Sequence, residues 1–276
     1  MIQKYLQQTK QQIKDFYNKI IIKFDFKDKK SSKNKSQKKE MGWFETLIYA
    51  ALLAVFFRSL FYEPFHIPSS SMKPNLLIGD YVFVSKLSYG YSKYSFPFGD
   101  KFNYFNGRIF SSEPQRGDVA VFRLPSEDSI NYIKRVIGLP GDKIQMTQGI
   151  LYINGNRVEK EFDGFFTELD EVGAPFDIMQ YRENISNKKK FLVLDQISEA
   201  PQDNTRVYVV PQGHYFFMGD NRDNSRDSRY GDVGFVPHEN LVGKAKIIFF
   251  SNPKPIWQPI NWIKSVRFSR IFDVIN

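Results

Sequence analysis

The sequence predicts an all-β body that follows a single membrane-spanning helix. Three observations support this fold class: one long apolar stretch near the N-terminus, short runs of alternating or β-branched residues in the rest of the chain, and turn motifs between those runs. The 276 residues are 42% hydrophobic and 25% charged, which is enough for one large or two small domains with a core. This ordinary composition excludes a disordered chain, a collagen and a multi-span membrane protein.

The positive charge of the chain is concentrated in residues 1–40. This basic tail holds 12 lysines against four acids, whereas the rest of the chain is nearly neutral. Apolar residues recur among the first lysines at helical spacing, which predicts an amphipathic helix in a cytoplasmic tail. Because the body carries no broad basic field, we expect no nucleic-acid partner.

Residues 41–62 are predicted to form the transmembrane helix. A helix rises about 1.5 Å per residue, so this stretch is long enough for a bilayer core of about 30 Å. Glu45 and Arg58 stand near its ends, where long side chains reach the interface. Only residues 46–57 are free of charge, so a buried soluble helix and a cleaved signal peptide stay open as alternatives.

The lysine-rich flank predicts the orientation of this helix. Positive residues stay on the cytoplasmic side of a membrane, so residues from Glu63 onward are expected on the far side. The chain is therefore expected to be a single-pass membrane protein with the lipid bilayer as one of its partners.

The body is predicted to consist of short antiparallel strands. The expected strands are residues 81–85, 119–123, 132–137, 150–153, 191–194, 206–210, 215–218 and 244–250. Turn motifs such as Pro140-Gly141-Asp142 separate them. Residues 159–204 are more polar and less regular than their flanks, which indicates part of an insertion, and residues 260–276 form an amphipathic segment expected to pack on the body.

The composition restricts the chemistry that the body can perform. The chain has no cysteine, which excludes disulfides, thiolate metal sites and a cysteine nucleophile. Its three histidines, His66, His214 and His238, have no spacing typical of metal ligands. Residues 221–227 resemble a calcium loop only superficially, because Arg226 stands where the loop needs glycine. We therefore expect neither a metal nor another cofactor.

Serine and lysine are the remaining candidates for nucleophile and base. Ser70-Ser-Met-Lys73 matches the S-x-x-K pattern of penicillin-recognising enzymes, but the chain lacks the S-D-N and K-T-G motifs of that site. Lys73 is accordingly expected to be exposed. A lysine can act as the base when its surroundings lower its pKa.

Lys134 is the other candidate base. It lies in a predicted strand in which alternation puts Tyr132 and Lys134 on one face, and Ile133 and Arg135 on the other. One of the two cations must share an apolar face, and the pattern does not say which. A strand with two cations that reach solvent is the alternative.

Four separated motifs together resemble the bacterial type I signal peptidases of the Ser–Lys class, in the Gram-negative type. They are residues 63–80, 116–122, 132–142 and 219–229, and they stand in the family order behind a single apolar span. One departure is Ser70, where a branch of the family has glycine. The resemblance implies a membrane-anchored catalytic β-domain of residues 63–145 and 213–276, with residues 146–212 as an inserted accessory β-region.

The resemblance also implies the roles of individual residues. Ser71 takes the nucleophile position and Lys134 the base position, while Ser69 supplies an oxyanion donor and Ser225 orients the lysine. Asp227 and Arg229 match a supporting ion pair, for which an ordinary surface pair is the alternative. The family positions that line the substrate pocket correspond to Phe65, Ile67, Pro68, Leu76, Tyr132 and Ile133.

The implied function is cleavage of signal peptides from exported preproteins after small-x-small sites, at the outer face of the bacterial inner membrane. Two other functions are weighed against it. One is a membrane-anchored β-domain that binds partners without catalysis. The other is a penicillin-recognising hydrolase that uses Ser70 and Lys73.

Overall fold

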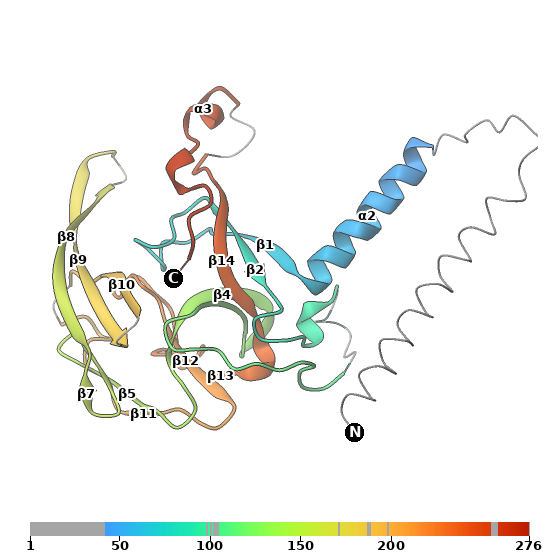
Figure 1. Cartoon of the computed structure of the whole chain (residues 1–276). Helices are drawn as coiled ribbons and strands as arrows, with labels where there is room; N and C mark the ends of the chain where they lie inside the picture. Colours follow the sequence, from blue (N-terminus) through green and yellow to red (C-terminus); the bar gives the residue numbers. More distant parts are fainter. Residues whose placement is uncertain are drawn as a thin grey trace, which may run out of the picture. The chain divides into compact units, whose positions relative to one another are not determined.

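The computed structural model describes residues 42–97, 99, 101, 105–170, 172–186, 189–197, 199–254 and 259–275 (Figure 1). The predicted amphipathic helix in the basic tail lies outside these residues. Within them, helix α2 (Trp43–Leu60) is the helix that is long and apolar enough to cross a membrane. Its apolar side chains are largely exposed, as expected of a helix surrounded by lipid. Glu45 in the first turn and Arg58 in the last complement the helix dipole.

The main sheet is antiparallel and has seven strands in the order β1-β2-β14-β3-β4-β12-β13. The strands are β1 (Tyr62–His66), β2 (Asp80–Ser85), β3 (Val119–Leu124), β4 (Glu127–Gly138), β12 (His214–Met218), β13 (Val236–Pro237) and β14 (Leu241–Ser251). Short 3-10 turns occur at Lys93–Ser95, His238–Asn240 and Phe268–Arg270. Strand β14, which is the last strand of this sheet in the sequence, pairs with both β2 and β3. It therefore joins the early strands β1 and β2 to the rest of the sheet.

The residues between β4 and β12 build two smaller antiparallel sheets. One contains β11 (Tyr208–Val209), β5 (Lys143–Thr147), β6 (Ile150–Ile153) and β7 (Asn156–Arg157), and the other contains β10 (Lys189–Leu194), β9 (Pro175–Ser186) and β8 (Glu159–Leu169). Strands β8 and β9 form the long yellow hairpin of Figure 1. Strands β8 and β9 are not among the strands expected from the sequence. A bulge at Gly164 and the many charged residues of β8 interrupt the alternation by which a strand is recognised.

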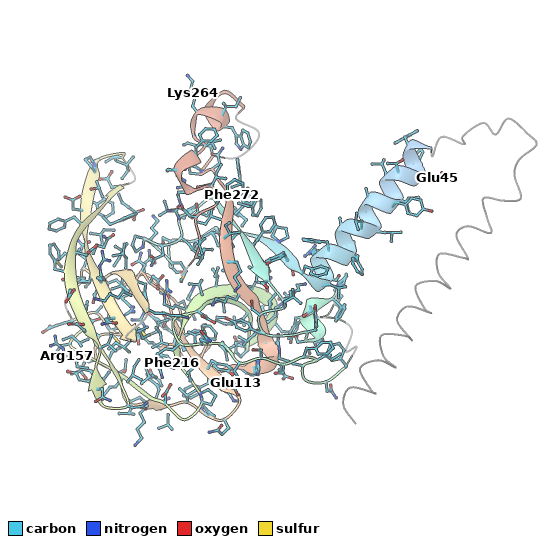
Figure 2. All side chains as sticks on the ribbon, in the orientation of Figure 1. Glu45, Glu113, Arg157, Phe216, Lys264 and Phe272 are labelled. Atoms are coloured by element: carbon cyan, nitrogen blue, oxygen red, sulfur yellow. The ribbon has the colours of Figure 1, made fainter. Side chains whose placement is uncertain are left out.

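The core follows the alternation of the predicted strands. Seven of the eight lie in observed strands, and the eighth, residues 206–210, extends beyond the two-residue strand β11. One cluster beneath β1, β2 and β14 includes Met72, Val82 and Ala245. A second lies where the smaller sheets meet the main sheet and includes Phe216, which Figure 2 shows inside the body. The body is therefore mostly β-structure, as the sequence predicts.

The C-terminal segment packs on the body through charge as well as apolar contact. After helix α3 (Pro259–Lys264), the side chains of Arg267 and Arg270 both pair with Asp80 at the start of β2. Ile275 is 9% exposed and joins the core cluster that contains Met72. The expected packing of this segment on the body is confirmed.

Candidate active site

Ser71 lies on the segment of residues 67–79 that joins β1 to β2. The backbone N–H of Ile67 donates to Asp80 O at 2.8 Å, and that of Gly79 donates to Ile67 O at 2.9 Å, which closes the ends of the segment. Met72 lies in the core and is fully buried. Asn221 N–H donates to Ser71 O at 3.1 Å. These contacts fix the backbone on both sides of Ser71. Ser71 itself is only 7% exposed.

Lys134 projects from β4 toward this serine. Its Nζ lies 2.7 Å from Ser71 Oγ and 3.0 Å from Ile133 O. The residue is 4% exposed, and its Nζ lies 5.1 Å from the centre of the Tyr132 ring. Ser71 and Lys134 are 63 positions apart in the chain, yet the main sheet brings their reactive atoms within hydrogen-bonding distance.

Arg135, the next residue of β4, is also buried, on the opposite face of the strand. Its guanidinium forms two hydrogen bonds of 2.7 Å with Asp220 and one of 2.8 Å with Gly117 O. The alternative of two cations that reach solvent is therefore wrong. Both cations are buried, and among the described residues Arg135 has a carboxylate as its direct partner whereas Lys134 does not.

Burial decides the protonation of Lys134. Loss of hydration disfavours the ammonium form and lowers the pKa of Lys134 to about 8, although the negative charges of Asp227 and Asp220 oppose the shift. An amine with this pKa is partly neutral near pH 7 and can accept a proton.

Two further serines predicted for the site lie close to the dyad in space. Ser69 Oγ is 3.3 Å from Ser71 Oγ, on an exposed residue. Ser225 is buried beside Gly219, and a side chain at that glycine would clash with Ser225. The expected hydrogen bond from Ser225 to Lys134 is not found among the described residues; the Ser225 hydroxyl instead helps to lower the pKa of the neighbouring Asp227.

Asp227 and Arg229 form a buried ion pair, so the alternative of a surface pair is wrong. The Arg229 side chain donates to both carboxylate oxygens of Asp227 at 2.9 Å, and the two side chains are at most 1% exposed. Burial alone would raise the pKa of Asp227, but Arg229 and the Gly219 N–H hold that pKa below its usual value. The carboxylate thus fixes the backbone of Gly219 through a 2.9 Å hydrogen bond.

A cavity of about 530 Å³ opens beside the dyad. It is lined by Phe65, His66, Ile67, Pro68, Ser69, Ser70, Ser71, Val121, Asn131, Tyr132, Ile133, Lys134, Asn224 and Arg226. Five of the six predicted pocket residues are among them. The prediction for Leu76 is wrong. Leu76 is fully buried in the core cluster that also contains Ile67, and it does not line the cavity.

Comparisons with known proteins identify the family of this chain. Residues 40–250 match the family described as "Signal peptidase, peptidase S26". A signal peptidase I of Rickettsia conorii is 44% identical over 88% of this chain and 95% of its own length, and one of Rickettsia prowazekii is 43% identical over 87% and 94%. The chain belongs to the S26 signal peptidase family.

The chain is thus an enzyme, a peptidase that processes signal peptides. Family membership excludes the two other functions that the sequence left open, the non-catalytic binding domain and the penicillin-recognising hydrolase. A solved structure of a signal peptidase I from Enterococcus faecalis V583 is 28% identical and covers 48% of this chain and 97% of its own, with a TM-score of 0.28.

The Ser70–Lys73 pair of this signal peptidase is not arranged as a dyad. Ser70 Oγ accepts a hydrogen bond of 2.9 Å from Asn224 Nδ2. Lys73 does not line the cavity but forms an ion pair with Glu168 of β8. The expectation of an exposed Lys73 is wrong, because the residue is only 8% exposed beneath the β8–β9 hairpin.

Sequence reasoning missed several residues around the signal peptidase cavity. His66, Asn131 and Asn224 supply polar groups at its rim, and Arg226 supplies a positive charge. His66 and Asn131 are neighbours of predicted pocket residues on β1 and β4, so strand position was the signal that could have found them.

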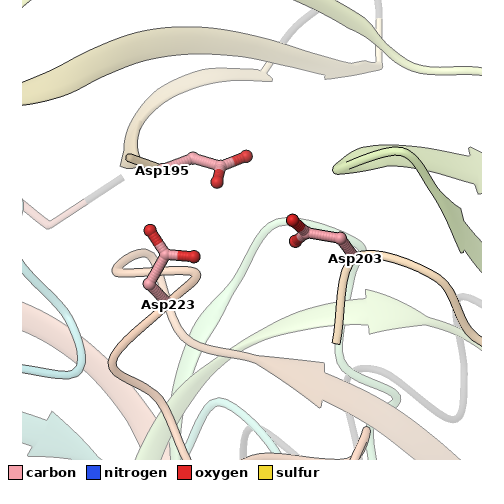
Figure 3. Close-up of side chains that lie close together, drawn as sticks. All are labelled: Asp195, Asp203 and Asp223. Atoms are coloured by element: carbon pink, nitrogen blue, oxygen red, sulfur yellow. The ribbon is translucent and has the colours of Figure 1, made fainter. Parts of the chain in front are cut away.

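Figure 3 shows three carboxylates that lie close together and that do not line this cavity. Asp195, Asp203 and Asp223 lie with oxygen atoms within 4.8 Å of one another. Lys160 forms an ion pair with Asp195, and two backbone N–H groups donate to Asp223. These contacts account for the cluster as part of the packing between the smaller sheets and the segment that follows β12.

Proposed function

We propose that this signal peptidase is a membrane-bound serine endopeptidase that uses Ser71 as nucleophile and Lys134 as general base. The observation that carries the proposal is the 2.7 Å distance between Lys134 Nζ and Ser71 Oγ, two buried side chains at the edge of the cavity. A serine hydroxyl is a weak nucleophile by itself and needs a neighbouring base, which a desolvated lysine provides.

The chemistry follows from these two groups. Neutral Lys134 takes the Oγ proton as Ser71 attacks the scissile carbonyl, and the resulting ammonium then gives this proton to the departing amine of the mature protein. Water next attacks the ester on Ser71 while Lys134 again accepts a proton. Lys134 returns this proton to Ser71 Oγ as the ester bond breaks, and the signal peptide leaves with a carboxylic acid that loses its proton to solvent, so that both side chains return to their starting state.

Hydrogen-bond donors for the oxyanion are proposed to be the Ser71 N–H and the Ser69 hydroxyl. The 3.3 Å separation of the two serine oxygens supports a shared position for the reacting carbonyl. Asp227 and Arg229 are proposed to support the site by holding the segment that carries Ser225, and Ser225 to orient the lysine when substrate is bound.

The substrate is proposed to be an exported preprotein that is cut after a small-x-small site such as Ala-x-Ala. Its extended end would pair with backbone near Ser71 and Lys134, so that main-chain hydrogen bonds supply affinity and shallow pockets supply specificity. The apolar lining of Phe65, Ile67 and Ile133 suits small aliphatic side chains.

We propose that the lysine-rich tail stays in the cytoplasm and that α2 anchors residues 63–145 and 213–276, the catalytic domain, at the outer face of the bacterial inner membrane. Residues 146–212 would form the accessory region. Anchoring raises the effective concentration of cleavage sites that emerge from the bilayer.

Cleavage of a purified preprotein with an Ala-x-Ala site by the detergent-solubilised full chain tests the proposal. Wild type and Ser70→Ala are expected to cut at this site, whereas Ser71→Ala and Lys134→Ala are expected to be inactive. Equal cleavage by all four proteins, or none by a folded wild type on several preproteins, would overturn the assignment.

A further inference from the structure

The three-stranded sheet β10-β9-β8 contacts the segment that carries Ser71 at both of its edges. On β8, Glu168 forms an ion pair with Lys73, which is two residues beyond Ser71. The two side chains are only 11% and 25% exposed. On β10, Leu192 O accepts a 2.7 Å hydrogen bond from Asn75 Nδ2. The nucleophile segment is thus held by both edge strands of one small sheet.

The central strand of this sheet holds the other side of the site. Glu183 of β9 forms a fully buried pair with Arg222, in hydrogen bonds of 2.5 and 2.6 Å. Arg222 Nε in turn donates to Gly219 O at 3.2 Å, and the neighbouring Asn221 N–H donates to Ser71 O. The sheet is therefore linked to both backbone segments that enclose the dyad.

The Lys73–Glu168 ion pair compensates for a positive charge that lies near Lys73. Among the described residues Arg267 also acts on the Lys73 ammonium, and its positive charge repels that ammonium. Without Glu168, a largely buried ammonium would keep a like charge nearby and lose its carboxylate partner. The Lys73 side chain would then move toward solvent and shift the backbone that bears Ser71.

We propose that Lys73 and Glu168 are positioning residues, through which the β8–β10 sheet holds Ser71 in line with Lys134. The proposal rests on the proposed dyad and adds a role for the accessory region in the rate of cleavage. Attack by the hydroxyl depends on its alignment within fractions of an ångström, and a misplacement of about 1 Å can reduce a rate by about 100-fold.

Steady-state kinetics of Glu168→Gln in the full-length, detergent-solubilised protein test this role. The kcat for preprotein cleavage is expected to fall by about 10- to 100-fold, with KM unchanged. KM should hold because neither Lys73 nor Glu168 lines the cavity. The reversed pair, Lys73→Glu with Glu168→Lys, is expected to recover most of kcat, since it restores the attraction and places a carboxylate near Arg267.

Asp163→Asn is the matched control. Asp163 pairs with Arg182 on the same hairpin at 2.7 Å and is about as exposed as Glu168, but its arginine is 45% exposed, and no contact of this pair with the Ser71 segment is found among the described residues. This variant should have the kcat of wild type, and circular dichroism should show that all variants are folded at the assay temperature.

Several outcomes would overturn the role. They are an unchanged kcat in Glu168→Gln, an equal loss in Asp163→Asn, no recovery in the reversed pair, and a rise in KM with kcat preserved. Failure of the dyad itself gives a different pattern, in which wild type is inactive or Ser71→Ala still cleaves.

Discussion

Arg135 and Asp220 share two parallel hydrogen bonds of 2.7 Å, and both side chains are 1% exposed. Arg135 follows the proposed base in β4, and Asp220 precedes Asn221, whose N–H donates to Ser71 O. This buried pair therefore joins the strand of the base to the segment that contacts the nucleophile. Loss of either partner is expected to lower the stability of the fold around the active site.

Asp220→Ala should destabilise the protein strongly. It leaves the Arg135 guanidinium buried without its carboxylate, and loss of one partner from a buried pair typically costs about 3–5 kcal/mol. Urea unfolding of the detergent-solubilised chain measures the change. Asp163→Ala, which breaks a more exposed pair, should cost at most about 1 kcal/mol, and equal losses in both variants would contradict the assignment.

Cleavage should increase with pH through the titration of Lys134. Because burial lowers the pKa of Lys134 to about 8, kcat/KM is expected to rise about tenfold per pH unit below pH 8 and to level off above it. A pH profile on a fixed preprotein measures this. Lys134→Arg, which stays protonated, should be inactive throughout, and a wild-type midpoint near pH 10 would show an ordinary lysine.

The same shift predicts a pH-dependent stability. Below pH 8 the folded protein keeps a buried ammonium, and between pH 8 and 10.5 the unfolded chain binds more protons than the folded one. Lysine burial therefore opposes folding most below pH 8, and this cost declines as pH rises to 10.5. Lys134→Met should gain stability relative to wild type at pH 7 and lose that advantage near pH 10, as measured by urea unfolding. A difference that is constant with pH would count against the shift.

Ser69→Ala should lower kcat with little change in KM. The Ser69 hydroxyl is 3.3 Å from Ser71 Oγ, and removal of one oxyanion donor typically reduces kcat by about 100- to 1,000-fold. Ser69→Thr keeps a hydroxyl and is expected to retain more activity. A Ser69→Ala enzyme with wild-type kcat would remove this residue from the oxyanion site.

Ile133→Ala should broaden the choice of substrate. Ile133 is half-buried in the cavity lining, and its truncation makes room for a larger aliphatic group of the substrate. The ratio of kcat/KM for a larger over a smaller side chain is expected to rise by about 10- to 200-fold. Competition between preproteins with Ala or Val before the cleaved bond measures the ratio. Leu151→Ala, in the core of the four-stranded sheet, is the control for general loosening and should leave the ratio unchanged.

Much of the fold could be predicted because its signals are local. The apolar stretch that forms α2 and the alternating runs that lie in observed strands are properties of neighbouring residues. The β8–β9 hairpin was missed as a regular element because its bulge and its charges interrupt that local pattern. Ser71 and Lys134 were identified by resemblance to the family motifs, since alternation alone left Lys134 and Arg135 equivalent.

The sequence by itself determined the class of the body, the apolar helix and the residues that carry the family motifs. Only the tertiary structure decided which charges are buried, and it corrected the expectation of an exposed Lys73. It also placed Leu76 in the core and not in the pocket lining. The reason is physical: a charge stays buried only when a partner compensates for its lost hydration. For Arg135 and Lys73 those partners, Asp220 and Glu168, lie far away in the chain, so no local pattern contains them.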